Sequence, residues 1–134
     1  MNTPAIQNVT ARNLIKLEDA PPFGAGAMPA DKERTFALLA HPFSLIIWLW
    51  KRRDSPVVDA HGKEALNFGI TIFLCMLPLN IILGLGFLPG IVVTIVGIAL
   101  MLVSLAMLAL LIFGGLKARE GKLLRYPFNF RLIK

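Results

Sequence analysis

Charged residues are scarce in this chain, and one long segment has none. Asp, Glu, Lys and Arg make up 16% of the 134 residues, and apolar residues make up 56%, whereas a soluble domain is nearer a quarter charged. Residues 65–116 contain no Asp, Glu, Lys or Arg. A surface helix of a soluble protein needs a polar back face, so this absence excludes an ordinary soluble domain. Because about 20 apolar residues cross a bilayer once, the segment is long enough to cross twice.

Cysteine and histidine are also nearly absent. The single cysteine, Cys75, excludes a disulfide or a thiolate metal site within one chain, and we expect it to be a small buried hydrophobe. One of the two histidines, His61, forms a His-x-x-Glu pair with Glu64, which is a weak metal signal. No phosphate-binding glycine loop is present, and no nucleophile, base and orienting group can be assembled outside the apolar segments. We therefore predict no enzyme, catalytic residue, cofactor, metal or small-molecule substrate.

Basic residues gather at the ends of the apolar segments. Residues 51–53 are Lys-Arg-Arg, and residues 117–134 hold most of the remaining excess in a net charge of +6. Cytoplasmic loops beside membrane spans carry such an excess, which explains the charge better than nucleic-acid binding does. We therefore predict a multi-pass protein with the 51–64 link and the C-terminus in the cytoplasm, and we predict no nucleic-acid partner.

Proline and glycine mark the boundaries of the predicted helices. The sequence predicts an all-α membrane protein with three main helices. Ser55-Pro56 is a typical helix start, so we place helices at about 56–83 and 91–119, joined by the glycine-rich turn 84–90 into a transmembrane hairpin. These helices and the first one belong to a membrane domain over residues 31–134. Residues 1–30 are predicted to be a flexible arm and linker, because proline and glycine interrupt their second half.

The first helix, at about 31–50, is too short to cross. Its apolar part, residues 36–50, would measure about 22 Å at 1.5 Å per residue, against about 30 Å of hydrocarbon. Pro42 lies inside it and would kink or break the helix. We favour a re-entrant or tilted interfacial helix over a full crossing.

Aromatic and basic residues lie next to one another at the expected membrane boundary. Trp48 and Trp50 stand beside Arg52 and Arg53. The tail, residues 121–134, would place its aromatic side chains on one side if it were extended, in the headgroup layer. The predicted interface anchors are Trp48, Trp50, Arg52, Arg53, Arg125, Tyr126, Phe128 and Phe130.

Two side-chain patterns lie on the hairpin helices. His61, Glu64, Asn67 and Thr71 follow i, i+3, i+4 spacing and form one polar face. An amide in the membrane needs a partner, so this polar face is either an interhelical hydrogen-bond clamp or the lining of a groove or path. The small-residue stripe repeats every seven residues, where helix backbones can approach closely. It would pack against the preceding helix or form a homo-oligomer seam, and its members are Gly90, Gly97 and Ser104.

Several motifs are shared with a known family. They are Leu39-Ala-His41, Ile46-Ile-Trp48-Leu49, Ser55 to Phe68, Lys117 to Gly121, and Arg125-Tyr126-Pro127. Over about residues 32–134 the chain resembles a family of small bacterial multi-pass membrane proteins related to the channel-like small subunit of the chloroplast inner-envelope protein-import translocon. The resemblance implies the bacterial cytoplasmic (inner) membrane and carries over motif residues without a catalytic role: His61, Glu64, Asn67, Gly121, Tyr126 and Pro127. The segment between the first two motifs is shorter here than in relatives.

These observations favour a non-enzymatic packing or interaction subunit. Its partners would be the lipid bilayer and either a second copy of itself or another membrane protein. The alternative is a channel or translocation component whose path is lined by the polar face. Four polar groups are few for an aqueous lining, so packing is the preferred function.

Overall fold

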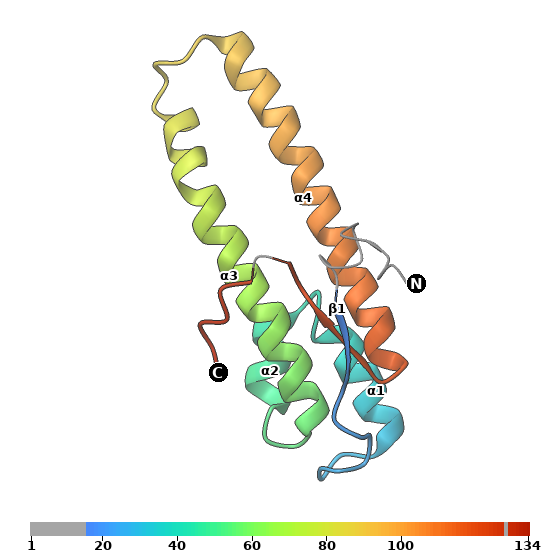
Figure 1. Ribbon diagram of the computed structural model, residues 1–134. Helices are drawn as coiled ribbons and strands as arrows, with labels where there is room; N and C mark the ends of the chain where they lie inside the picture. Colours follow the sequence, from blue (N-terminus) through green and yellow to red (C-terminus); the bar gives the residue numbers. More distant parts are fainter. Residues whose placement is uncertain (1–15, 128) are drawn as a thin grey trace, which may run out of the picture.

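The fold is a long helical hairpin that carries a small head at its basic end (Figure 1). The computed structural model describes residues 16–127 and 129–134, so the predicted anchor Phe128 lies outside the described residues. The hairpin consists of α3 (Pro56–Gly84) and α4 (Gly90–Arg119). The head comprises the lower ends of these helices together with β1 (Lys16–Asp19), α1 (Ala30–Leu39), α2 (Ser44–Lys51), β2 (Lys122–Arg125) and the rest of the tail.

The hairpin helices form where the sequence predicts them. The Ser55 side chain accepts a hydrogen bond from the backbone N–H of Val58 at 3.2 Å, which caps α3 just before Pro56. Gly86, with a φ of 76°, provides the left-handed residue that the turn needs. Both helices are long and apolar enough to cross a membrane, with mean hydropathies of 2.1 and 2.9 in their most apolar stretches.

The first apolar segment forms two short helices, so the prediction of one helix at 31–50 was wrong. The described residues contain four helices where the sequence analysis expected three. Pro42 lacks a backbone N–H and lies in the turn that separates α1 from α2. With ten and eight residues, the two helices measure only about 15 and 12 Å. Neither is long enough to cross a bilayer.

A two-stranded antiparallel sheet joins the ends of the described chain, so the all-α prediction was also wrong in this detail. Lys16 pairs with Arg125 and Asp19 pairs with Lys122. Residues 16–19 had been assigned to the flexible arm, and residues 122–125 to an interfacial strip. Oppositely charged neighbours stabilise such a pair: Glu18 contacts Arg125 at 2.7 Å, and Asp19 contacts Lys122.

The core lies in the head and depends on small residues. A Cβ added at Gly62 would lie 2.7 Å from the Trp48 ring, and one at Gly115 would lie 2.8 Å from the Leu38 carbonyl oxygen. Glycine at these positions therefore lets α2 and α1 approach the hairpin. The hairpin beyond the head is exposed in the isolated chain, and this includes Cys75, which was expected to be buried. Its apolar surface is the part that a membrane would cover.

Candidate functional site

The polar face of α3 is buried in the head. His61, Glu64, Asn67 and Thr71 have exposed fractions between 0% and 5%. Buried polar groups need hydrogen-bond partners, and each of these four side chains has at least one in the tail or in the turn between α1 and α2. Among the described residues, His61 Nε2 is buried without a partner. The structure thus brings together all four residues of the predicted polar face.

Asn67 and Thr71 hold the tail against α3. The Asn67 amide donates to the Ile133 carbonyl at 2.8 Å, and its own oxygen accepts from the Ile133 N–H at 2.7 Å. The Thr71 hydroxyl donates to the Asn67 carbonyl at 2.8 Å and accepts from the Phe130 N–H at 3.1 Å. At Asn67 and Thr71 the polar face is therefore bonded to the chain's own backbone.

Glu64 is a buried carboxylate with several donors. One oxygen accepts from the Tyr126 N–H at 3.1 Å, and the other accepts from the Arg125 guanidinium at 3.0 Å. The guanidinium of Arg131 lies 3.6 Å from the same oxygen. Since a buried charge without partners costs several kcal/mol, these contacts explain how α3 tolerates a carboxylate at the membrane boundary.

Arg125 also joins the face to the sheet. It donates to Glu18 at 2.7 Å, and this hydrogen bond, with a smaller contribution from Lys16, lowers the pKa of the Glu18 carboxyl. Arg125 therefore makes internal contacts, although the sequence analysis predicted a headgroup anchor.

Three rings form a second buried network beside Glu64. His41 Nδ1 lies 2.5 Å from the Tyr126 hydroxyl, and His41 Nε2 lies 3.1 Å from His61 Nδ1. Burial, with a contribution from His61, lowers the pKa of His41 to about 3. Burial, with a contribution from Glu64, raises the pKa of Tyr126. Both groups are therefore neutral at pH 7.

The network is sealed by close packing. The Phe68 ring stacks on Tyr126 with centroids 4.2 Å apart, and a Cβ at Gly114 would lie 2.4 Å from the Tyr126 hydroxyl. A general acid or base must reach its substrate. Phe68 covers the face of the Tyr126 ring, and α4 at Gly114 packs against Tyr126 and His41, so these contacts restrict access to the two side chains. Sequence reasoning missed His41 and Gly114 as partners. The scarcity of histidine and the shared motif Leu39-Ala-His41 were the signals that could have drawn attention to His41.

The predicted interface anchors separate into two groups. Trp48 is buried and donates from its indole N–H to Asp59 at 2.8 Å, and the Arg52 guanidinium lies 4.6 Å from the Trp48 ring centroid. These residues, like Arg125 and the buried Tyr126, serve internal packing. The exposed anchors remain available for the predicted contact with lipid headgroups: Trp50, Arg53 and Phe130.

The small-residue stripe does not contact α3. A Cβ added at Gly90 or Gly97 meets no heavy atom within 4 Å outside its own helix, among the residues described. Ser104 is exposed, and its hydroxyl donates to the Leu100 carbonyl at 2.8 Å. The three residues therefore lie on an open surface of α4. The closely packed glycines are instead Gly62, Gly114 and Gly115.

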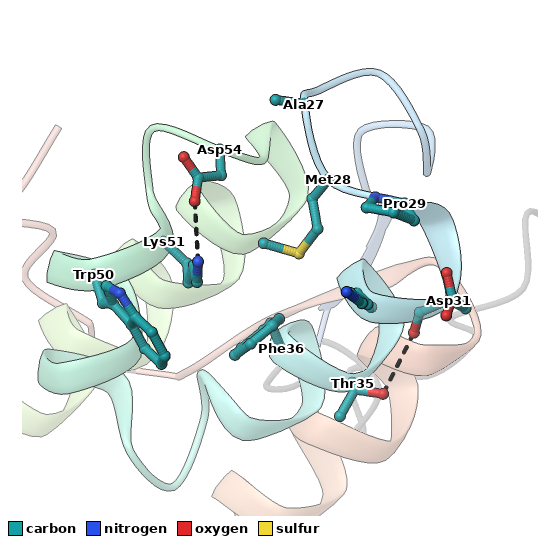
Figure 2. Close-up of a pocket in the computed structure, with 10 residues that line it drawn as sticks. Ala27, Met28, Pro29, Asp31, Thr35, Phe36, Trp50, Lys51 and Asp54 are labelled. Atoms are coloured by element: carbon teal, nitrogen blue, oxygen red, sulfur yellow. Dashed lines mark hydrogen bonds and ion pairs between the residues drawn. The ribbon is translucent and has the colours of Figure 1, made fainter.

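A pocket of about 650 Å³ is lined by α1, by the segment that precedes it and by the end of α2 (Figure 2). Phe36 and Trp50 meet edge to face with centroids 6.0 Å apart. The Lys51 ammonium lies 4.5 Å from the Trp50 centroid and pairs with Asp54 at 3.2 Å. Over residues 16–127 and 129–134, no group of three or more His, Cys, Asp or Glu side chains is placed to hold a metal ion.

Comparison with known proteins gives one match. The profile of the magnetosome magnetite crystal formation protein family matches residues 32–133. No curated protein and no solved structure matches the chain. The match supports the expected small bacterial membrane protein family and gives no link to the chloroplast translocon.

Proposed function

The chain belongs to the magnetosome magnetite crystal formation protein family, and from this membership we propose that it takes part in magnetite crystal formation as a non-enzymatic membrane subunit. In this function it packs with itself or with another protein of the same membrane. The family membership suggests magnetite crystal formation as the process. The arrangement of side chains in the head supports a structural and non-enzymatic role in it.

The observation that carries the proposal is that the chemically capable side chains of the head bind one another. Glu64 is held by Arg125 and by the Tyr126 N–H, and His41 lies between Tyr126 and His61. Among these groups only His61 Nε2 is buried without a hydrogen-bond partner in the described part of the chain, and networks with most of their groups paired favour a single packed arrangement. They support a rigid structural part better than they support a site for chemistry.

The surface that remains is apolar and lies along the hairpin. None of the most apolar 18-residue stretch of α4 is buried within the chain. Lipid can cover such a surface, and so can another helix. The exposed stripe of Gly90, Gly97 and Ser104 is where a second helix backbone would approach most closely, because small residues leave room for it.

Charge placement supports an action through the membrane and not through contact with mineral. With the basic ends in the cytoplasm, the turn 84–90 is the part of residues 16–127 and 129–134 that reaches the far side, and this turn carries no charged residue. Hard cations are bound by carboxylate and other oxygen ligands. The turn offers no carboxylate, so we assign the effect on crystals to packing within the membrane.

The experiment uses a magnetite-forming bacterium from which the resident members of this family have been deleted. We expect the intact chain to restore crystal size, measured by electron microscopy. Gly97→Leu with Ser104→Leu fills the stripe and should insert normally but fail to restore crystals. The control, Ala99→Leu with Ala106→Leu, adds similar bulk at the same spacing on the opposite side of α4 and should restore them. Full activity of the stripe variant would refute the packing proposal.

A further inference from the structure

We propose that a basic pocket between α3, β2 and the tail binds the phosphate of an anionic phospholipid headgroup. The pocket has a volume of about 240 Å³. Since a water molecule occupies about 30 Å³ in the liquid, a phosphate group and part of its glycerol can enter. The basic side chains that line it are Lys63, Arg125, Arg131 and Lys134.

The charge balance in the pocket favours an anion. Glu64 is the only carboxylate side chain among the lining residues, and it is buried beneath Arg125 and Arg131. Lys63 pairs with Asp59 at 2.7 Å on the surface of α3, a pair that water screens. Arg131 is half-exposed and makes only a long contact to Glu64, so part of its five N–H donors remains for a ligand.

The position of the pocket points to a lipid and not to a soluble phosphate. Glu64 is the last charged residue before the uncharged segment 65–116, so the pocket lies where α3 enters the hydrocarbon. In the adjoining tail, Phe130 and Leu132 have exposed fractions of 64% and 59%. Apolar side chains at this depth insert beside the acyl chains, and basic pockets beside membrane helices recognise acidic headgroups.

This site is separate from the packing stripe on α4, so the two proposals can fail independently. The test uses the full chain purified in detergent, with phosphatidylglycerol, phosphatidylcholine or inorganic phosphate added. Native mass spectrometry counts bound lipid, and thermal unfolding reports stabilisation. We expect phosphatidylglycerol to bind and to raise the unfolding temperature, and we expect the other two additives to have little effect.

Two double variants that lose the same charge distinguish lipid binding in the pocket from general attraction between a basic protein and an anionic lipid. Lys63→Gln with Arg131→Gln should weaken phosphatidylglycerol binding about 30-fold, because each basic residue near an anionic surface contributes roughly a factor of five. The control, Lys117→Gln with Arg119→Gln, also removes one paired lysine and one exposed arginine and should bind like the parent chain.

Three results would overturn the inference. They are equal weakening in both double variants, equal binding of the two lipids, and stabilisation by inorganic phosphate that matches phosphatidylglycerol. If the pocket variant does not fold in detergent, Lys134→Gln alone takes its place, because Lys134 is exposed on the tail. The expected loss is then about fivefold, and no loss would refute the site.

Discussion

Replacing Gly114 by alanine tests the tightest contact between α4 and the tail. The added Cβ would lie 2.4 Å from the Tyr126 hydroxyl oxygen and 2.8 Å from His41 Nδ1. Neither atom can move freely, because the two are hydrogen-bonded to each other at 2.5 Å and His41 is also hydrogen-bonded to His61. Overpacking of this kind costs about 1–3 kcal/mol, whereas alanine gains up to about 1 kcal/mol over glycine inside a helix. We therefore expect a net loss of about 1–2 kcal/mol.

The same substitution at Gly97 is the control. Gly97 lies on the same helix with nothing within 4 Å of an added Cβ, so Gly97→Ala should be neutral or slightly stabilising. Reversible unfolding in detergent gives both values. If Gly114→Ala is as stable as Gly97→Ala, the close approach of α4 to the ring network is refuted.

A double-mutant cycle identifies the atom responsible. Tyr126→Phe removes the hydroxyl and leaves the stacking on Phe68, and alone it should cost about 1–3 kcal/mol because His41 Nδ1 loses its partner. In this background Gly114→Ala should cost clearly less than in the parent chain, since only the contact with His41 remains. Strict additivity would show that the hydroxyl and the α4 backbone are not in contact.

Three further results are expected. Asn67→Leu removes two hydrogen bonds to the tail and should lower the free energy of unfolding by about 1–3 kcal/mol; a gain in stability would instead favour a water-lined path. His41 should make the free energy of unfolding fall as the pH drops from 6.5 towards 3, contributing up to about 1.4 kcal/mol per pH unit, because unfolded His41 takes up a proton in that window and folded His41 does not. The His41→Gln variant should show a shallower pH dependence. In a Cys75→Ser background, an impermeant thiol reagent outside intact cells should label a cysteine at Leu88 and not one at Lys122, and the reverse pattern would invert the proposed orientation.

The hairpin could be predicted because its signals are local. The cap at Ser55, the proline that follows it and the turn glycine Gly86 each act within a few residues, and hydropathy marks the helices between them. The polar face was visible for the same reason, since i, i+3, i+4 spacing is a local pattern.

The partners of the polar face were not visible in the sequence. Asn67 bonds to a residue 66 positions later, and His41 bonds to Tyr126 across 85 positions. No local periodicity encodes which distant backbone group satisfies a buried amide or imidazole. The tail illustrates the difficulty, because its alternation suggested a strip on the lipid surface, whereas Tyr126 is buried and the backbone of Ile133 and Phe130 serves as a hydrogen-bonding strap.

The long separation of these contacts also sets the order of events during synthesis. Arg125 is synthesised 61 residues after Glu64 and 107 residues after Glu18, the two carboxylates that it contacts. At about 5–20 residues per second, the β1 strand and the Glu64 carboxylate stay without Arg125 for several seconds after they leave the ribosome. The head therefore closes only after both hairpin helices have been synthesised. Until then Glu64 lacks the arginine that pairs with it in the folded head.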